Sequence, residues 1–381
     1  MDSAVLTWQA PTGWSAPLPA ALDSTATLVL VFGPPALDEL SVLVDEIRRA
    51  FPRALLAGAS SDTVIEDGRI GDARVAVSIT RFDHSQLALV SAFNDGHDFD
   101  GGRRMAHDLA TRRGLVAVLA LADGLLVDGS ELVRGLLDGL PAGVLLTGGM
   151  AADGTRFDRT WVIAEGVPSR GAAVAIGFYG ERLQVHSVSR GGSVGFGPRR
   201  RVTHAQGNVV YELDGRPALE LYEQYLGRYA SALPASAAHF PLCVYRGAQG
   251  EPPLIRYVLG IDRVRQSITF AGDVPRGSLV QLSRAARGEL LRAADQAAHE
   301  LGAWCTPATA DRPLLNIVVS CIGRRVVLGE QTDAEVELVA QLLPSGASQI
   351  GFYSYGEIAS GQRATCDMHN MTLTLTTIGE A

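Results

Sequence analysis

The chain has 381 residues, of which 47% are hydrophobic and 19% charged, and its formal net charge is -8 at pH 7. This length exceeds what one ordinary core needs and predicts two domains, while the composition is that of a soluble globular protein and excludes a disordered chain. The negative charge disfavours a nucleic-acid-binding protein, because contacts to phosphates require clustered Lys and Arg.

Residues 1–24 contain several prolines and two tryptophans, Trp8 and Trp14, and lack the basic-then-apolar order of a secretion signal. We expect them to form an extended arm that packs its tryptophans on the first lobe. The sequence contains no apolar run of transmembrane length. We therefore expect a cytoplasmic protein that does not bind membranes.

From Thr25 onward, strand and helix patterns alternate. The continuous apolar run Leu28–Phe32 is typical of a strand covered on both faces, and apolar residues at helical spacing follow between Leu40 and Phe51. Ser130 is a suitable cap for a later helix. Further strands are expected at 54–57, 75–79, 87–93, 115–121 and 144–146, and a further helix after Gly101 and Gly102.

Between Trp161 and Tyr211 the pattern changes to strands without long helices, which predicts an antiparallel meander. A short helix at 217–226 then closes the first lobe. Small residues with one proline at 231–238 indicate a linker. We therefore divide the chain into the arm at 1–24, a first lobe at 25–230 and a second lobe at 231–381.

The second lobe repeats the mixture of strands and helices. We expect one long helix capped by Ser283 and another that opens with a capping box at Thr332–Glu335. The last strand alternates, with Leu373 and Leu375 on one face and threonines on the other. The predicted fold is a mixed α/β (α+β) protein of two lobes, each with mixed, largely antiparallel sheets flanked by helices. Strands of this lobe are expected at 254–259, 266–270, 279–282 and 314–321.

The late stretch 351–358 (Gly-Phe-Tyr-Ser-Tyr-Gly-Glu-Ile) combines aromatic rings, hydroxyls and an acid, and Asp-Met-His-Asn follows at 367–370. Polar groups on a loop between rigid elements indicate function more than core residues do. The alternative is a strand, a turn and an edge strand with hydroxyls facing water. Residues 58–65 partly repeat this stretch. When the two are aligned, Gly58, Ser61 and Ile65 are identical to their counterparts Gly351, Ser354 and Ile358. Two related lobes would place these loops near each other.

The late stretch resembles the signature of the C-terminal FIST domain, which is written in much the same way and is followed by His-Asn. Residues 58–65 resemble the N-terminal version, although Ala59, Thr63 and Val64 stand where the family often has Cys, Gly and Glu. Residues 148–154 resemble a glycine-rich turn of the family, and residues 202–219 resemble the junction between its halves.

This resemblance implies a sensory module that binds a small molecule and is not an enzyme. Stand-alone bacterial members that resemble this chain bind haem and report nitric oxide to a histidine kinase, which makes a haem sensor with a kinase partner the leading hypothesis. A sensor of an amino-acid-like metabolite is the second hypothesis. A hydrolase using Ser354 and His369 is the third, and it requires the base to lie within hydrogen-bond reach of the nucleophile.

The expected sites follow from these hypotheses. Haem needs one axial histidine and an apolar pocket, so His186, His204 and His239 are the candidate haem ligands. The histidines do not cluster at zinc-ligand spacing, and the four cysteines are isolated. The expected ligand contacts are Tyr353, Ser354, Tyr355, Gly356, Glu357, His369, Asn370, Ser60, Ser61 and Gly149.

Overall fold

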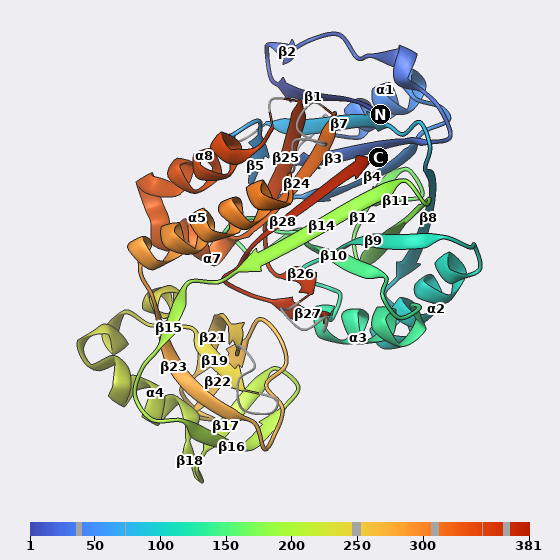
Figure 1. Cartoon of the computed structure of the whole chain (residues 1–381). Coiled ribbons are helices and arrows are strands. Elements are labelled where there is room, and N and C mark those ends of the chain that lie inside the picture. The colour runs from blue at the N-terminus through green and yellow to red at the C-terminus, as the bar shows by residue number, and fades with distance from the viewer. Residues whose placement is uncertain (36–39, 73, 246–252, 306–311, 345, 361–365) are drawn as a thin grey trace.

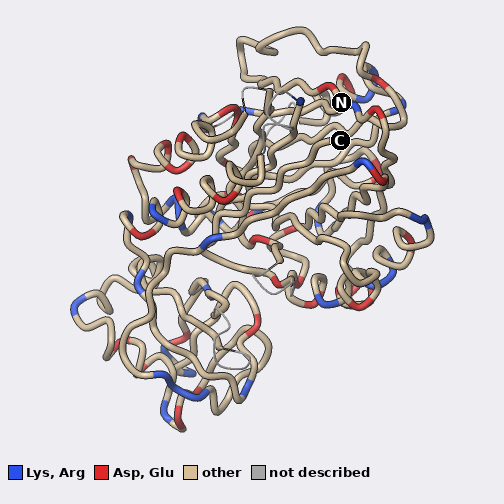
Figure 2. The backbone as a smooth tube through the Cα atoms, viewed as in Figure 1, with Lys and Arg blue, Asp and Glu red and all other residues tan. Residues whose placement is uncertain are grey.

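The computed structural model describes residues 1–381 except 36–39, 73, 246–252, 306–311, 345 and 361–365. The chain is a mixed α+β protein in two domains with mostly antiparallel sheets, which confirms the predicted fold class. A large body of three sheets stands above a smaller β domain (Figure 1). Charged residues are concentrated in the outer helices and loops, while the central strands contain few of them (Figure 2).

The three sheets of the body share one five-strand plan. Three strands pair antiparallel in succession, the third pairs parallel with a fourth, and the fourth pairs antiparallel with a fifth. The first sheet is β1 (Asp2–Gln9), β7 (Val75–Arg81), β3 (Thr27–Gly33), β4 (Leu55–Ser60) and β11 (Val162–Ala164). The second is β8 (Gln86–Phe93), β13 (Ala172–Tyr179), β9 (Leu115–Ala122), β10 (Leu145–Met150) and β26 (Glu357–Ser360). The third is β14 (Leu183–Arg190), β28 (Leu373–Glu380), β24 (Leu314–Cys321), β25 (Ala347–Ser354) and β5 (Thr63–Glu66).

The fifth strand of each sheet comes from the chain segment of another sheet. Strand β5 follows β4 of the first sheet but pairs with β25 of the third. Strand β26 follows β25 but pairs with β10 of the second sheet, and β11 follows β10 but pairs with β4 of the first. The exchange is cyclic, so the body has pseudo-threefold symmetry. Four short strands extend the sheets: β2 (Gly13–Trp14), β12 (Val167–Ser169), β27 (Cys366–His369) and β6 (Arg69–Asp72).

Each sheet packs one face on a core shared by all three sheets and the other face under helices. In β3, the side chains of Leu28, Leu30 and Phe32 join the shared core, while Val29 and Val31 join the cluster beneath the first helix. The Phe32 ring stacks on Phe352 of β25 at 4.5 Å between centroids. This confirms the strand predicted to be covered on both faces. The covering helices are α1 (Leu40–Ala50), α2 (Asp98–Ala110), α3 (Gly129–Gly139), α5 (Arg287–Trp304) and α8 (Thr332–Leu342).

The small β domain has its own core and is joined to the body by two chain crossings. The chain enters it after β14 and returns to the body at the start of α5. The expected linker at 231–238 lies inside this domain, as part of two consecutive 3-10 helices. The elements of the domain are β15 (Ser193–Gly195), β16 (Arg200–Gln206), β17 (Val209–Leu213), β18 (Arg216–Pro217), α4 (Ala218–Leu226), η2 (Gly227–Ala232), η3 (Ala235–His239), β19 (Leu242–Tyr245), β20 (Leu254–Arg256), β21 (Val258–Asp262), β22 (Ser267–Phe270) and β23 (Leu279–Ala285).

Several predicted helix starts were wrong. The cap of α3 is Asp128, not Ser130: its carboxylate accepts the N–H groups of Ser130 and Glu131. Ser283 does not cap α5, because its hydroxyl donates to the carbonyl of Pro241 within the small domain. Helix α2 begins before its two glycines, and the second of them, Gly102, allows its backbone to pack closely on α3. Helix α7 (Ile322–Leu328) was not predicted.

The last strand alternates as predicted, but its threonines do not face water. Strand β28 lies between β14 and β24, and every residue in it is buried. The threonines therefore hydrogen-bond to other strands. Thr374 donates to Ser189 of β14 at 3.0 Å and Thr377 to Asn316 of β24 at 2.9 Å, while Thr376 contacts Thr147 of β10, in the second sheet, at 2.6 Å.

The N-terminal arm forms a regular strand. Residues 2–8 pair in unbroken register with β7, and Trp8 and Trp14 pack against the cluster beneath α1. In the part of the chain that the structure describes, no helix is both long and apolar enough to cross a membrane.

Candidate functional site

The three crossing loops, where the chain passes from one sheet to the next, meet in the body. Gly58, Gly148 and Gly351 occupy equivalent steps of the parallel strand pairs, and a Cβ at any of them would collide with a carbonyl of the partner strand. The stretches at 58–65 and 351–358 are therefore neighbours, as their partial repeat predicted. Gly148 and Gly149 belong to β10 and not to a turn. Hydrogen bonds join the loops: Ser61 Oγ to Tyr353 O at 2.9 Å, Ala152 N to Ser60 O at 2.8 Å, and Met150 N to Gly356 O at 2.8 Å.

Most polar groups of the late stretch form hydrogen bonds where the three crossing loops meet, a place that we call the junction. Glu357 is fully buried and its carboxylate accepts the hydroxyl of Ser354 at 2.6 Å. The other carboxylate oxygen accepts the N–H of Thr372 at 3.1 Å and its hydroxyl at 2.8 Å. Glu357 thereby ties the start of β26 to the start of β28, which gives it a structural role.

Burial raises the pKa of Glu357 to about 7, against the hydrogen bonds that favour its charged form. Between pH 4.5 and 7 the folded protein keeps a proton that the unfolded chain releases. The free energy of unfolding should therefore fall as pH rises through this window, by on the order of 3 kcal/mol from this group.

The measurement is urea unfolding at several pH values, comparing the protein with a Glu357→Gln variant. The difference between the two free energies should change across pH 4.5 to 7 and be constant above it. A difference that does not vary with pH would contradict the raised pKa.

The side chain of Tyr355 is directed away from the junction, and its hydroxyl donates to the carboxylate of Asp153. That carboxylate also accepts the backbone N–H groups of Phe157, Asp158 and Arg159 at 2.8–2.9 Å. Burial alone would raise the pKa of Asp153, but these hydrogen bonds outweigh it and lower the pKa. The bonds hold the loop so that the Phe157 ring stacks on Tyr355 at 4.8 Å, with 11° between the planes.

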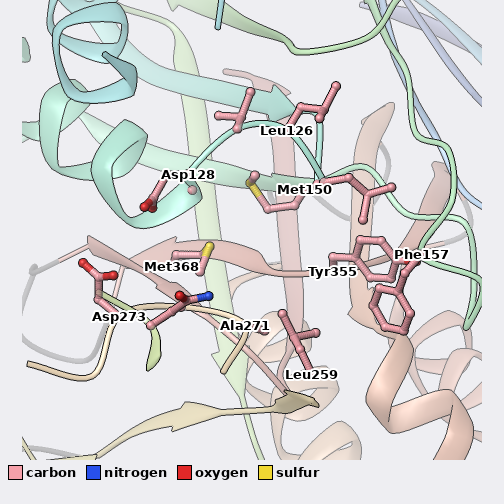
Figure 3. Close-up of a pocket in the computed structure, with 15 residues that line it drawn as sticks. Leu126, Asp128, Met150, Phe157, Leu259, Ala271, Asp273, Tyr355 and Met368 are labelled. Carbon is pink, nitrogen blue, oxygen red and sulfur yellow. The ribbon is translucent and has the colours of Figure 1, made fainter. Parts of the chain in front are cut away.

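A hollow of about 330 Å³ lies beside Tyr355, between the body and the small β domain (Figure 3). The loop from β9 to α3, at residues 124–129, forms one wall. The next wall comes from the crossing loops and from β27, and it consists of Met150, Phe157, Tyr355 and Met368. The small domain closes the hollow with Asn208, Leu259 and residues 271–273.

The hollow is acidic as well as apolar. The carboxylate residues Asp128 and Asp273 line it, and no Lys or Arg is among the described residues of its lining. Burial, followed by the charge of Asp128, raises the pKa of Asp98. Burial raises the pKa of Glu131, and Asp128 and Asp273 add to the rise despite the opposing charge of Arg134. These neighbouring negative charges favour a positively charged group.

Of the expected ligand contacts, Tyr355 lines this hollow and the others do not. Ser354, Ser60 and Ser61 are fully buried in the junction, where their hydroxyls bond to other protein groups. Asn370 donates to the carbonyl of Tyr355 at 3.1 Å, and its Oδ1 accepts the N–H of Tyr257 at 3.4 Å. Tyr353, Gly356 and Glu357 are buried, Gly149 is within β10, and His369 lies opposite Glu357 in the β26–β27 pair.

The three candidate haem ligands lie in different environments. His186 stacks on Trp304 at 5.3 Å, and burial lowers its pKa. His204 stacks on Tyr211 at 4.7 Å. His239 lines a second hollow of about 1080 Å³ beside the small domain, together with apolar and aromatic side chains. Of these three histidines, His239 lines one of the two hollows, and His186 and His204 line neither.

Most residues that line the smaller hollow were not predicted from the sequence. Asp128 had a local signal, because an acid followed by Gly-Ser after a buried strand is a common helix start. Met150, Phe157 and Met368 resemble ordinary core residues, and Asp273 comes from a distant segment. Only the folded chain brings these residues together.

Matches to protein families agree with this architecture. The family model for the FIST N domain matches residues 27–216, and that for the FIST C domain matches residues 218–360. Together they span most of the chain. The chain belongs to the FIST family. FIST domains are signalling sensor domains, and the boundary between the two matched regions falls in the small β domain, at the start of α4.

One relative of this FIST protein is an uncharacterized protein of Methanocaldococcus jannaschii, MJ1623, which is 28% identical over 209 residues. The aligned part covers 50% of this chain and 39% of the relative. The aligned half of the chain therefore corresponds to about two fifths of that protein.

Proposed function

We propose that this FIST protein is a non-catalytic sensor whose hollow beside Tyr355 binds a metabolite-sized molecule with a cationic amino group. The observation that supports the proposal is the position of Tyr355. It is the residue of the late stretch that enters a hollow, and acidic residues line the same hollow. An amino acid or a related amine has the required chemistry.

The size and lining of the hollow support this ligand class. A volume of about 330 Å³ is at the lower end of the range of about 300–1,000 Å³ for small-molecule sites. The rings of Tyr355 and Phe157 offer aromatic faces that attract an ammonium group, and Asp128 and Asp273 supply negative charge. Met150 and Met368 provide an adaptable apolar surface for the rest of the ligand.

A ligand in this position would contact both domains. It would therefore favour one placement of the small domain relative to the body, which is a common way to convert binding into a signal. We propose that a separate cytosolic partner, such as a histidine kinase, reads this change.

The test is a thermal-shift panel of amino acids and amines, each beside its neutral or acidic analogue. Binding to the folded state alone raises the melting temperature, by an amount that grows with ligand concentration. We expect amines to raise it and their N-acetyl analogues not to. No shift with any amine, or equal shifts with the acetylated analogues, would contradict the proposal.

Two variants localise the binding. Asp128→Asn keeps an effective helix cap but removes the charge, and Asp273→Asn removes the other acid. We expect both to weaken amine binding. Asp138→Asn, near the far end of α3 and exposed, is the matched control that should leave binding unchanged.

A haem sensor is the second candidate function, and His239 supports it. The lining of the larger hollow includes His239, aromatic rings and arginines that suit a carboxylate-bearing porphyrin. His239 would hold the iron, to which nitric oxide would bind.

Haem supplied during expression should give a Soret band that shifts with nitric oxide. His239→Ala should abolish the band and His204→Ala should leave it intact. An unchanged spectrum in His239→Ala would reject this ligand.

The hydrolase hypothesis has no comparable support. The Ser354 hydroxyl is fully buried and donates to Glu357, so a substrate could not reach it without opening the junction. A nucleophile needs both access and a base, and we do not propose catalysis.

A further inference from the structure

The larger hollow, of about 1080 Å³, has an aromatic wall that is partly open to solvent. Phe240 forms the centre of this wall, with Tyr229 at 5.3 Å and Phe196 at 6.4 Å between ring centroids. Tyr229 is 45% exposed and Val194, on the same lining, is 53% exposed. Exposed apolar side chains gathered around a concave surface are typical of a binding site.

Three arginines from separate segments line the same hollow: Arg228 in η2, Arg284 in β23 and Arg287 at the start of α5. The Arg228 guanidinium lies 5.0 Å from the Tyr229 ring centre and donates to its hydroxyl at 3.0 Å. This hydrogen bond lowers the pKa of Tyr229, and the charge of Arg284 contributes. Two guanidinium groups are therefore near the same edge of the aromatic wall.

The acid on this lining is already paired. Glu289 forms an ion pair with Arg292, one turn further along α5. Among the described residues of the lining, the arginines thus outnumber the acid, and the hollow favours a negatively charged ligand. Planar guanidinium groups match the geometry of a carboxylate.

We propose that the larger hollow binds an apolar molecule that carries a carboxylate. The apolar part lies on Phe196, Tyr229 and Phe240, and the carboxylate meets Arg228 and Arg284. Val194 lies where the chain enters the small domain, and residues 285–287 lie where it returns to the body. A ligand in the hollow therefore contacts both connections between the domains. The site is separate from the amine site beside Tyr355. Haem has the same chemistry, but the proposal depends on the arginines and not on iron or His239.

The test is fluorescence titration with cis-parinaric acid and, as its neutral match, its methyl ester. We expect the acid to bind at least tenfold more tightly than the ester. The double variant Arg228→Gln/Arg284→Gln should reduce the affinity for the acid to that for the ester. Both side chains are exposed, so the variant should fold. Arg216→Gln, on an exposed ion pair elsewhere in the small domain, is the control and should bind normally.

The outcomes separate this site from the two functions proposed above. Normal acid binding in His239→Ala and in Asp128→Asn supports an arginine-based site independent of haem and of the amine hollow. Equal binding of acid and ester, no binding of either, or an unaffected double variant would overturn the inference. Loss of acid binding in His239→Ala with the arginine variant unaffected would also overturn it.

Discussion

Replacing Arg324 with methionine should lower the free energy of unfolding by about 3–5 kcal/mol, because the change leaves a buried acid without its partner. Arg324 and Glu335 are both fully buried. Their side chains meet through Arg324 Nε and Nη2, which lie 2.7 and 2.6 Å from Glu335 Oε1. Ser320 donates to the other carboxylate oxygen at 2.7 Å.

Arg324 also connects the parts of the chain that lead to and from the small domain. Its guanidinium donates to the carbonyl of Gly191, just after β14, and to that of Leu290 in α5 at 3.0 Å. A third contact reaches the carbonyl of Met371 at 3.3 Å. Loss of this side chain would therefore remove hydrogen bonds to three carbonyls as well as the charged partner of Glu335.

Urea unfolding of Arg324→Met, Glu335→Leu and the double variant measures this effect. The double variant should recover part of the stability lost by either single change, because an apolar pair leaves no unpaired buried charge. A single-variant loss below about 1 kcal/mol, the value of an exposed pair, would contradict the structural role of this ion pair.

Tyr355→Ala should weaken binding of the best amine by about tenfold or more, equivalent to at least 1.4 kcal/mol. The change removes one aromatic face of the hollow and the stacking partner of Phe157. It also removes the hydroxyl that bonds to Asp153, so the loop that carries Phe157 loses a contact. Isothermal titration calorimetry would give the affinity.

The matched control is Tyr353→Phe in the same stretch. Tyr353 is fully buried and lines neither hollow, so the variant should bind the amine normally. Equal loss of affinity in both variants would mean that the stretch acts through folding and not through contact. Unchanged affinity in Tyr355→Ala would remove Tyr355 from the site.

The sequence predicted the main elements well because their signals are local. The apolar run Leu28–Phe32, the helix after Leu40 and the alternation of the last strand depend on neighbouring residues. The cyclic exchange of strands left almost no such signal. The stretch around Gly148 shares little with the other two crossing loops beyond the glycine that a close strand contact requires.

The candidate site was only partly predictable. Polar residues at 351–358 indicated function, yet Ser354 and Glu357 are polar because three crossing loops meet there and buried polar groups need partners. Tyr355 differs from them only in the direction of its side chain, which the sequence does not specify. Asp128 joins Tyr355 from the loop before α3 of the body, and Asp273 joins it through the placement of the small domain.

The most direct test of the amine site is NMR of the protein labelled with ¹³C in its methionine methyl groups. Met150 and Met368 line the hollow, whereas Met105 and Met371 are buried elsewhere. On titration with the best amine, the signals of Met150 and Met368 should shift saturably while those of Met105 and Met371 remain unchanged. Saturable binding that leaves Met150 and Met368 unmoved would contradict the proposed site.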